Sequence, residues 1–568
     1  MEGASFVTLF DRGQARRVAG QLRPGATRVD EELALLVARR EGTDAVLAGT
    51  VTAQDGGYHI DARLLEPSSG KALARGEKSV ATKPDALPAV TRIAADLRRA
   101  LGDRTPESAQ LAAAETFSAG SLQAAHHYAL AQEAQWAGSG DEGIREYMSA
   151  LELDPDLGRA YAGLAVIHAN RLQRPEAEKY YALAFSKIDR MSEREKHRTR
   201  GGYYLMVRNY PRAIEEFSAL VEKYPADTGG LYNLALAHFY SRDMAGALKG
   251  GRRAIDRYPA NTFYKANASL FAMYAGDFAD AVARAKAVLE HSPSYLEPAV
   301  ALALSELALG HPDRAAEGYR RLATVSPQGA SLAAVGLADL AAYEGRLADT
   351  EEILAEGIRA DEGNKNPAAA AHKLAMLGQI RLLRGEKAGA LEAAARAEKS
   401  SRLESDRFET ARVYLAAGRV PRAQALASEL ASRLEPDPRA YALLIEGEID
   451  LVNGNPREAA RHFQEAGAMA DTWLGRFDLG RALVEAGAFA EAHSELERCL
   501  ARRGEATAVF LDDRPSYRYL PPVYYFLGRA QEGLGSPAAQ QSYETFLAIK
   551  KTDQDPLVRE VRRRLASR

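Results

Sequence analysis

The sequence predicts a mainly α-helical protein: a solenoid of about twelve helix–turn–helix repeats, with a small α/β domain in front. Prolines recur every 34 residues, at Pro225, Pro259, Pro293 and Pro327. Twelve residues before each proline lies an alanine: Ala213, Ala247, Ala281 and Ala315. Proline ends the preceding helix and marks a turn between units, whereas alanine lets two helices approach closely. A periodic array of helical hairpins follows from both signals.

This 34-residue period resembles the tetratricopeptide repeat, and the resemblance implies a right-handed superhelix. The length of 568 residues exceeds one compact domain, as a solenoid would. Apolar residues make up 46% and charged residues 27%, which is typical of soluble proteins. The net charge of −3 does not favour a nucleic-acid partner, because such a protein normally has a basic face.

Residues 1–102 do not follow the repeat and are expected to form the small α/β domain. Stretches with strand character are Ser5–Phe10, Asp44–Ala53, the alternating run from Tyr58 to Leu64, and Lys71–Val80. Stretches with helical character are Gly13–Leu22, Val29–Arg40 and Asp85–Leu101. The glycine-rich turn at 54–57 joins two of the strands, as in a hairpin.

The strings AVLAGTV and GYHIDARLLEPSSGKAL resemble the domain of TolB-N-terminal-like and FlgO-like proteins. Together with the array, including MSEREKHRTRGGYYLMVRNYPRAIEEF and YLPPVYYFLGRAQEGLG, the chain is similar to the C-terminal sensor region of bacterial multidomain serine/threonine kinases. Such domains usually open with a further strand and helix. We therefore expect residues 1–102 to be incomplete, with an unpaired sheet edge beside the 5–10 strand.

The remaining chain divides into a linker at 103–120, the repeat array at 121–552 and a C-terminal capping helix at 553–568. In the array, the second helix of each repeat is expected to follow a glycine: Gly276, Gly310, Gly345, Gly385, Gly418, Gly454 and Gly487. The weakest repeats are 330–366, with Thr350 at the alanine position, and 404–437. A closing helix is needed because the last repeat has no neighbour to cover its apolar face.

No pattern of residues indicates catalysis, so an enzyme is not expected. The phosphate-binding motif GxxxxGK[ST] and the kinase catalytic strings are absent, so no cofactor is expected. His126 and His127 are adjacent on a helix and do not point at one metal, so no metal is expected either. Cys499 falls at a small buried position and is interpreted as a core thiol. The acidic residues are interpreted as solvated side chains on helix faces.

A functional site must then be a surface, and first helices of such repeats line the concave groove. The predicted partner-binding residues are Tyr232, Leu236, Phe239, Phe263, Leu270, Met273, Phe477, Arg481, Tyr525 and Arg529. Aromatic, apolar and arginine side chains suit peptide capture, but each of them could instead pack between repeats. A chaperone-type carboxylate clamp is not favoured: Arg198 and Asn233 could belong to one, but Gly202 and Phe263 occupy other required positions.

One long irregular insertion, at 502–520, interrupts the regular spacing of the repeats. Its aromatic residues Phe510, Tyr517 and Tyr519 are not expected to be fully exposed. Two interpretations are open: a loop folded over the last two repeats, or a lid that contacts a ligand.

The sequence therefore predicts a non-enzymatic scaffold that binds a protein or peptide in the concave groove, in bacterial signalling by resemblance. The alternative is the sensor or regulatory half of a serine/threonine kinase whose catalytic domain lies outside this chain. No signal peptide or apolar span is recognisable, which favours the cytoplasm. A periplasmic location is the alternative if the chain is the C-terminal region of a transmembrane kinase.

Overall fold

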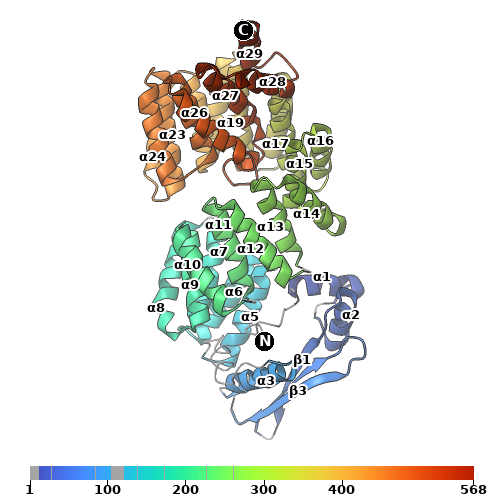
Figure 1. Cartoon of the computed structure of the whole chain (residues 1–568). Coiled ribbons are helices and arrows are strands. Elements are labelled where there is room, and N and C mark those ends of the chain that lie inside the picture. The colour runs from blue at the N-terminus through green and yellow to red at the C-terminus, as the bar shows by residue number, and fades with distance from the viewer. Residues whose placement is uncertain are drawn as a thin grey trace. The chain divides into compact units, whose positions relative to one another are not determined.

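The computed structural model describes residues 10, 12–26, 28–54, 56–82, 85–103, 120–136, 138–171, 173–225, 227–259 and 261–567. The chain divides into two compact units, Met1–Tyr264 (unit 1) and Lys265–Arg568 (unit 2), which are considered separately. Figure 1 labels the elements along the chain. The predicted strand Ser5–Phe10, except Phe10, and residues 104–119 of the predicted linker lie outside the described residues.

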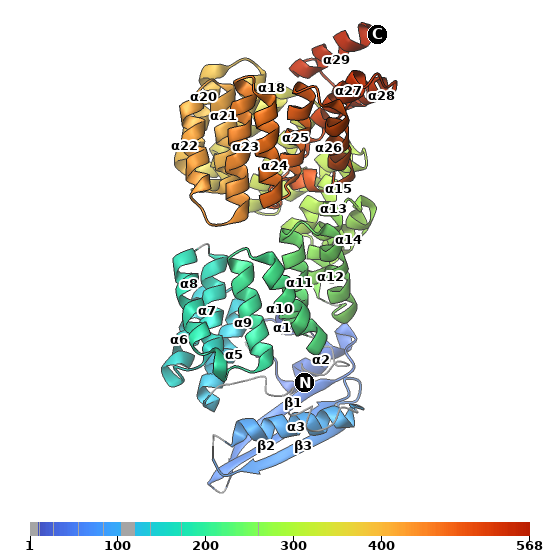
Figure 2. The same ribbon diagram turned by 60° about the vertical axis from the view of Figure 1, so that its left-hand side comes forward.

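Unit 1 begins with the predicted small α/β domain. Its elements are α1 (Arg12–Leu22), α2 (Glu31–Glu41), β1 (Val46–Gln54), β2 (Gly57–Leu65), β3 (Ala72–Val80) and α3 (Ala86–Ala100). The strands form an antiparallel sheet in the order β1–β2–β3. Helix α3 lies along one face of this sheet (Figure 2), where Ile93 and Leu97 join Ile60 and Leu64 in a buried cluster. Alternation of apolar and polar residues along β2 places Ile60 and Leu64 on that one face.

Helix α3 contacts β2 and β3, whereas the apolar side chains of β1 stay open. Leu47 and Val51 pair with Leu64 and Ile60 across the sheet, yet they are 51% and 54% exposed. Strand β1 is an edge of the sheet formed by the described strands. That the domain lacks an upstream strand and helix stays a prediction, which a stability comparison with and without added upstream sequence can test.

Helical hairpins make up most of the remaining described chain. In unit 1 the helices are α5 (Leu122–Trp136), α6 (Gly140–Leu153), α7 (Gly158–Asn170), α8 (Arg174–Ser186), α9 (Glu193–Met206), α10 (Tyr210–Lys223), α11 (Thr228–Tyr240) and α12 (Met244–Arg257), with a short 3-10 turn, η1 (Ile188–Arg190). Helix α13 (Thr262–Tyr274) starts at the boundary between the units.

Unit 2 continues with α14 (Phe278–His291), α15 (Leu296–Ala308), α16 (Pro312–Ala323), α17 (Pro327–Tyr343), α18 (Leu347–Gly363), α19 (Pro367–Leu383), α20 (Lys387–Ser400), α21 (Glu404–Ala416) and α22 (Val420–Ala431). It ends with α23 (Pro436–Val452), α24 (Pro456–Met469), α25 (Trp473–Glu485), α26 (Phe489–Ala501), α27 (Pro521–Gly533), α28 (Ala538–Ile549) and α29 (Pro556–Ala566). Paired from α5 to α28, the described helices form twelve hairpins, which confirms the predicted architecture.

The turn inside each hairpin of unit 2 depends on a glycine in the left-handed region. All seven glycines predicted to precede a second helix have positive φ, from 72° at Gly418 to 84° at Gly310, and a helix begins two residues after each. Glycine adopts this conformation without a steric penalty because it has no Cβ. In unit 1, Arg208 and Arg242 occupy the same turn position, with φ of 59° and 65°.

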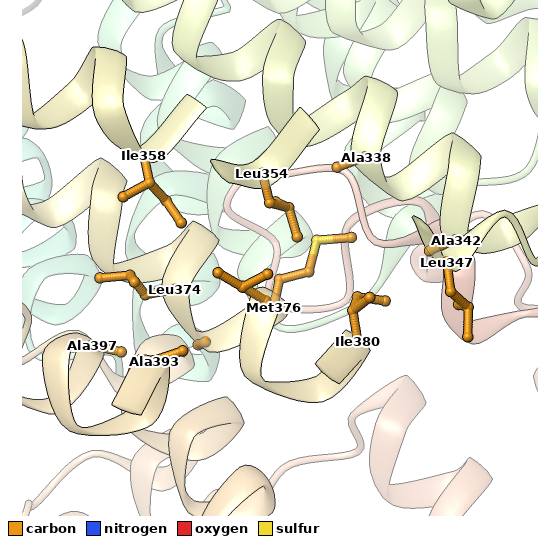
Figure 3. Close-up of a cluster of buried hydrophobic side chains, with 12 residues drawn as sticks. Ala338, Ala342, Leu347, Leu354, Ile358, Leu374, Met376, Ile380, Ala393 and Ala397 are labelled. Carbon is orange, nitrogen blue, oxygen red and sulfur yellow. The ribbon is translucent and has the colours of Figure 1, made fainter. Parts of the chain in front are cut away.

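Small residues of one helix face large side chains of the next. A Cβ on Gly336 of α17 would lie 2.2 Å from the Tyr319 ring of α16, so that position has no room for a side chain. Figure 3 shows the neighbouring cluster, in which Leu354 and Ile358 of α18 face Leu374 of α19. Close packing of this kind continues from hairpin to hairpin, as expected of a repeat array.

The two repeats with the weakest sequence signal form regular hairpins, α17–α18 and α21–α22. Thr350 is fully buried at the position where other repeats have alanine, and its hydroxyl donates to the Arg346 carbonyl at 2.8 Å. Its polar atom is therefore satisfied inside its own helix. Cys499 is also fully buried, and burial raises the pKa of its thiol, which agrees with a core role.

The close helix contact at Ala281 of α14 gives a direct test of the packing between helices. Ala281 of α14 is fully buried, so Ala281→Leu will overpack this contact and lower the free energy of unfolding by about 1–3 kcal/mol. Ala279→Leu on the exposed side of the same helix is the matched control and will have little effect. Equal effects in denaturant unfolding would show that Ala281 is not at a tight helix contact.

The end of unit 2 returns to an earlier hairpin of the same unit. The Lys551 amide donates to the Glu344 carbonyl at 2.8 Å, and the Lys550 ammonium donates to the Ala342 carbonyl at 3.1 Å. Helix α29 then packs against α28 through Val558 and Val561, which are buried with Phe546. The predicted closing helix is therefore present, and the segment before it joins the turn between α17 and α18.

Candidate functional site

The predicted groove residues of unit 1 lie at different depths. Phe263 is 44% exposed, and Tyr232 and Leu236 are half-buried. Phe239, at 6% exposed, is buried. Only the first three can contact a partner without a rearrangement of the helices. Of the two groove residues predicted on α13 within unit 2, Leu270 is 6% exposed and Met273 is fully buried, so both are core side chains.

The predicted residues near the end of the array are engaged within the protein. Phe477 and Tyr525 are buried, and both pack against the Phe526 ring. Arg481 pairs with Glu448, and Arg529 pairs with Glu485 at 2.5 Å. These four residues therefore stabilise unit 2 and do not form an open groove.

An aromatic cluster joins α11 and α13 in unit 1. The Tyr232 ring lies 4.8 Å from the Phe263 ring and 6.3 Å from the Tyr264 ring, measured between centroids. Tyr264 in turn packs on the buried Tyr258. Because this buried ring pair supports Tyr232, the exposed face of Phe263 is held on a rigid base.

A buried charge cluster lies beside the aromatic cluster. Asp227 is fully buried and accepts hydrogen bonds from Arg194 at 2.6 Å and from Arg198 at 2.8 Å. Burial opposes ionisation, but the two guanidinium groups and the Gly230 amide outweigh it and lower the pKa of Asp227 to about 2. Since Arg198 is bound to Asp227, it is not available for the carboxylate clamp that the sequence already disfavoured.

The insertion at 502–520 lies against the first helices of the hairpins in unit 2, a surface that we call the inner face. Its first contact is at the end of α13, where a Cβ on Gly504 would lie 2.4 Å from the Tyr274 carbonyl oxygen. The Tyr274 hydroxyl donates to Asp513 at 2.8 Å. Farther along, Phe510 packs between Phe408 of α21 and Tyr441 of α23.

Arg518 anchors the insertion to the inner face. Its guanidinium lies 3.2 Å from Asp339 of α17 and 2.9 Å from Glu409 of α21, and all three side chains are at least nine-tenths buried. Asp339 also accepts from the backbone amides of Tyr517 and Arg518, at 2.8 and 3.2 Å. Burial still raises the pKa of Asp339, although Arg518 opposes this shift.

This arrangement corrects the first of the two interpretations of the insertion. It does not fold over the last two repeats alone, because it contacts hairpins from α13 to α23, and Arg518 and Asp339 are 179 residues apart. The aromatic residues are covered as expected: Tyr517 is 1% exposed and stacks on Tyr343. Two 3-10 helices, η2 (Glu505–Ala508) and η3 (Tyr517–Tyr519), and a buried ion pair hold the segment in place. That the segment also contacts a ligand stays a prediction.

Sequence reasoning also missed that acidic residues on the inner face are buried. Asp339, Glu409 and Asp478 are fully buried and belong to ion-pair networks. Burial raises the pKa of Asp478 to about 6, with nearby Glu448 adding to the shift. The available signal was a lone carboxylate inside an apolar first helix, as in the string GLADLAAY around Asp339.

A cavity of about 330 Å³ remains where the insertion meets α15, α17 and the start of α19. Leu296, Val300, Leu332 and Val335 provide an apolar wall. Glu297, His372, Lys373 and the loop residues Asp512, Asp513 and Arg514 provide polar groups. The volume falls at the lower end of the range for small-ligand pockets in proteins.

Within the described residues, no group of three or more histidine, cysteine, aspartate or glutamate side chains is placed to hold a metal ion. His127 lies 2.7 Å from Glu146 through Nδ1. In the same part of the chain, no helix combines the length and the apolar character that crossing a bilayer would require.

Comparison with known proteins identifies the repeats. Residues 200–262 and 270–330 match the family model described as tetratricopeptide repeat, so the array contains repeats of this type. No curated protein sequence matches the chain.

Solved structures with similar helical arrays share little sequence with the chain. A tetratricopeptide repeat protein from Parabacteroides merdae is 16% identical over 51% of this chain and 99% of its own, with a TM-score of 0.30. Yeast Tom70 is 16% identical over 73% of this chain and 97% of its own, with a TM-score of 0.40. The pilus biogenesis factor PilW is 17% identical over 35% of this chain and 92% of its own, with a TM-score of 0.31.

Proposed function

We propose that the chain is a non-enzymatic scaffold that captures a protein or peptide segment on the first helices of unit 1, at the Tyr232–Phe263 cluster. The observation that carries this proposal is the 44% exposure of Phe263 on a base of packed tyrosine rings. An aromatic side chain that is exposed and rigidly held provides contact area at little cost in conformational entropy.

The contrast with unit 2 supports the same conclusion. The inner face of unit 2 is covered by residues 504–520, and its aromatic side chains are paired with those of the insertion. A segment that docks there must displace Arg518 from two buried carboxylates. The first helices of unit 1 carry half-buried Tyr232 and Leu236 together with the exposed ring of Phe263.

The test is to select peptides from a displayed random library on the purified chain and to measure their affinity for variants. Replacing Tyr232 and Phe263 together by alanine will weaken binding by about 2–4 kcal/mol if both are hot spots. Met148→Ala and Leu153→Ala, which remove exposed apolar side chains from α6, are the controls and will bind normally. Unchanged affinity of the double variant, with unchanged circular dichroism, would place the binding surface elsewhere.

We further propose, on the sequence resemblance alone, that the partner belongs to a bacterial signalling system. The alternative is that the chain is the regulatory half of a serine/threonine kinase whose catalytic domain is encoded elsewhere. An upstream reading frame for a kinase domain and a membrane helix would favour this alternative. In either case the purified chain will not bind ATP, because no phosphate-binding motif is present, and calorimetry with Mg-ATP checks this expectation.

A further inference from the structure

The cavity on the inner face of unit 2 has an excess of carboxylates. The Lys373 ammonium is fully buried and donates to Asp361 at 2.5 Å and to Ser331 at 2.8 Å. The Arg514 guanidinium lies 3.3 Å from Asp406 and 3.7 Å from Asp512. Both cations are therefore neutralised by carboxylates of the protein.

Two further carboxylates lie at the same cavity, Glu297 on α15 and Asp513 on the insertion. Asp513 accepts from the Tyr274 hydroxyl, which carries no charge. Burial, with repulsion from Asp512 and Glu297, raises the pKa of Asp513 to about 7. The shift is in the direction expected for a carboxylate without a nearby cation to stabilise its charge.

His372 adds an independent indication of a ligand. Its side chain is at least nine-tenths buried and lines the cavity, and its Nδ1 lies 3.3 Å from Asp406 Oδ1. A carboxylate can only accept, so Nδ1 carries a proton and donates to Asp406. The buried Nε2 of the same ring has no hydrogen-bond partner among the described residues. A buried polar atom without a partner is a place where a ligand atom can supply one.

We propose that this cavity binds an alkylammonium or alkylguanidinium group, with the alkyl part on the apolar wall and the cation between Asp513 and Glu297. The two carboxylates without a paired cation match a donor-only cation, and the wall of Leu296, Val300 and Leu332 matches its methylene groups. A divalent metal fits less well, because no set of three metal ligands is found in the described part of the chain. The inference does not depend on the partner surface of unit 1.

The experiment measures binding of cadaverine, agmatine and the capped tripeptide acetyl-Ala-Arg-Ala-amide to the full chain by calorimetry and ligand-detected NMR. Cadaverine and agmatine, the two free amines, are expected to bind with a dissociation constant below about 1 mM, whereas 1-pentanol, which lacks the charge, will not. Binding of the free amines alone would identify a small-molecule site. Binding of the tripeptide as well would identify an arginine or lysine side chain as the source.

Two variants locate the site. Asp513→Asn is expected to lower the affinity for cadaverine by about tenfold or more, because one charged contact is lost. Glu297→Gln changes an exposed carboxylate at the rim of the cavity. If Asp513→Asn alters the circular dichroism, the affinity of Glu297→Gln for cadaverine becomes the test of the site. Glu356→Gln on α18, exposed and outside the cavity, is the control. Equal binding of 1-pentanol, absence of binding of either amine, competition by Mg²⁺ or Ca²⁺, or unchanged affinity in both variants would overturn the proposal.

Discussion

Arg518→Met will lower the free energy of unfolding of unit 2 by about 3–5 kcal/mol, because it leaves two buried carboxylates without their cation. Asp339 and Glu409 are 1% and 0% exposed and have Arg518 between them. Methionine fills a similar volume, so the loss reports the missing charge more than a cavity. Denaturant unfolding followed by the fluorescence of Trp473, which is buried in unit 2, measures the effect.

The sign of the pH dependence identifies the cause. Without Arg518, the pKa of Asp339 will rise further in the folded state, so folding will take up a proton and the variant will lose stability as pH increases. The destabilisation is therefore expected to be larger at pH 8 than at pH 5. Arg562→Ala breaks an exposed pair with Asp553 and will change stability by about 0–1 kcal/mol. A similarly small loss for Arg518→Met would mean that the buried ion pair does not hold the insertion.

Asp227→Asn will destabilise unit 1 by about 2–4 kcal/mol near neutral pH, because Arg194 and Arg198 lose a buried countercharge. Asparagine can still cap α11 by accepting from the Gly230 amide, so the change isolates the charge. The pKa of Asp227 is about 2 in the folded protein against an ordinary value of 3.8. Its contribution is therefore present above about pH 4 and is lost as pH falls toward 2.

The difference in stability between wild type and Asp227→Asn should thus shrink steadily from pH 5 to pH 2. Hydrogen exchange of α9 and α11 at several pH values gives the measurement for unit 1 separately. Arg212→Ala, which breaks an exposed pair with Glu215, serves as the control. A difference that stays constant with pH would show that Asp227 acts through packing and not through its ionised form.

The hairpins could be predicted because their signals are local. Gly345 or Gly385 ends a first helix within its own turn, and Ala281 or Ala315 marks a helix contact within its own repeat, so a few neighbouring residues suffice. The same reasoning found the strands of the small domain from period-two alternation and a glycine turn. Boundaries differed from the structure by one to a few residues, as is usual for helix and strand ends.

The position of the insertion could not be predicted because its contacts are distant in sequence. Arg518 meets Glu409, 109 residues earlier, and Tyr274 meets Asp513, 239 residues later. For the candidate site, the repeat pattern predicted that Tyr232 and Met273 face the groove, but it did not predict how deeply each side chain is buried. Met273 is fully buried and Phe263 is 44% exposed, although both occupy groove positions of the same helix.

Residues 504–520 cover the inner face of unit 2 and belong to its fold. Hydrogen exchange by mass spectrometry on the full chain tests this placement most directly. The amides of Tyr517 and Arg518, which donate to Asp339, are expected to exchange as slowly as those of α17 and α21. Exchange of the 505–520 segment within seconds at neutral pH, as in an exposed loop, would contradict the account.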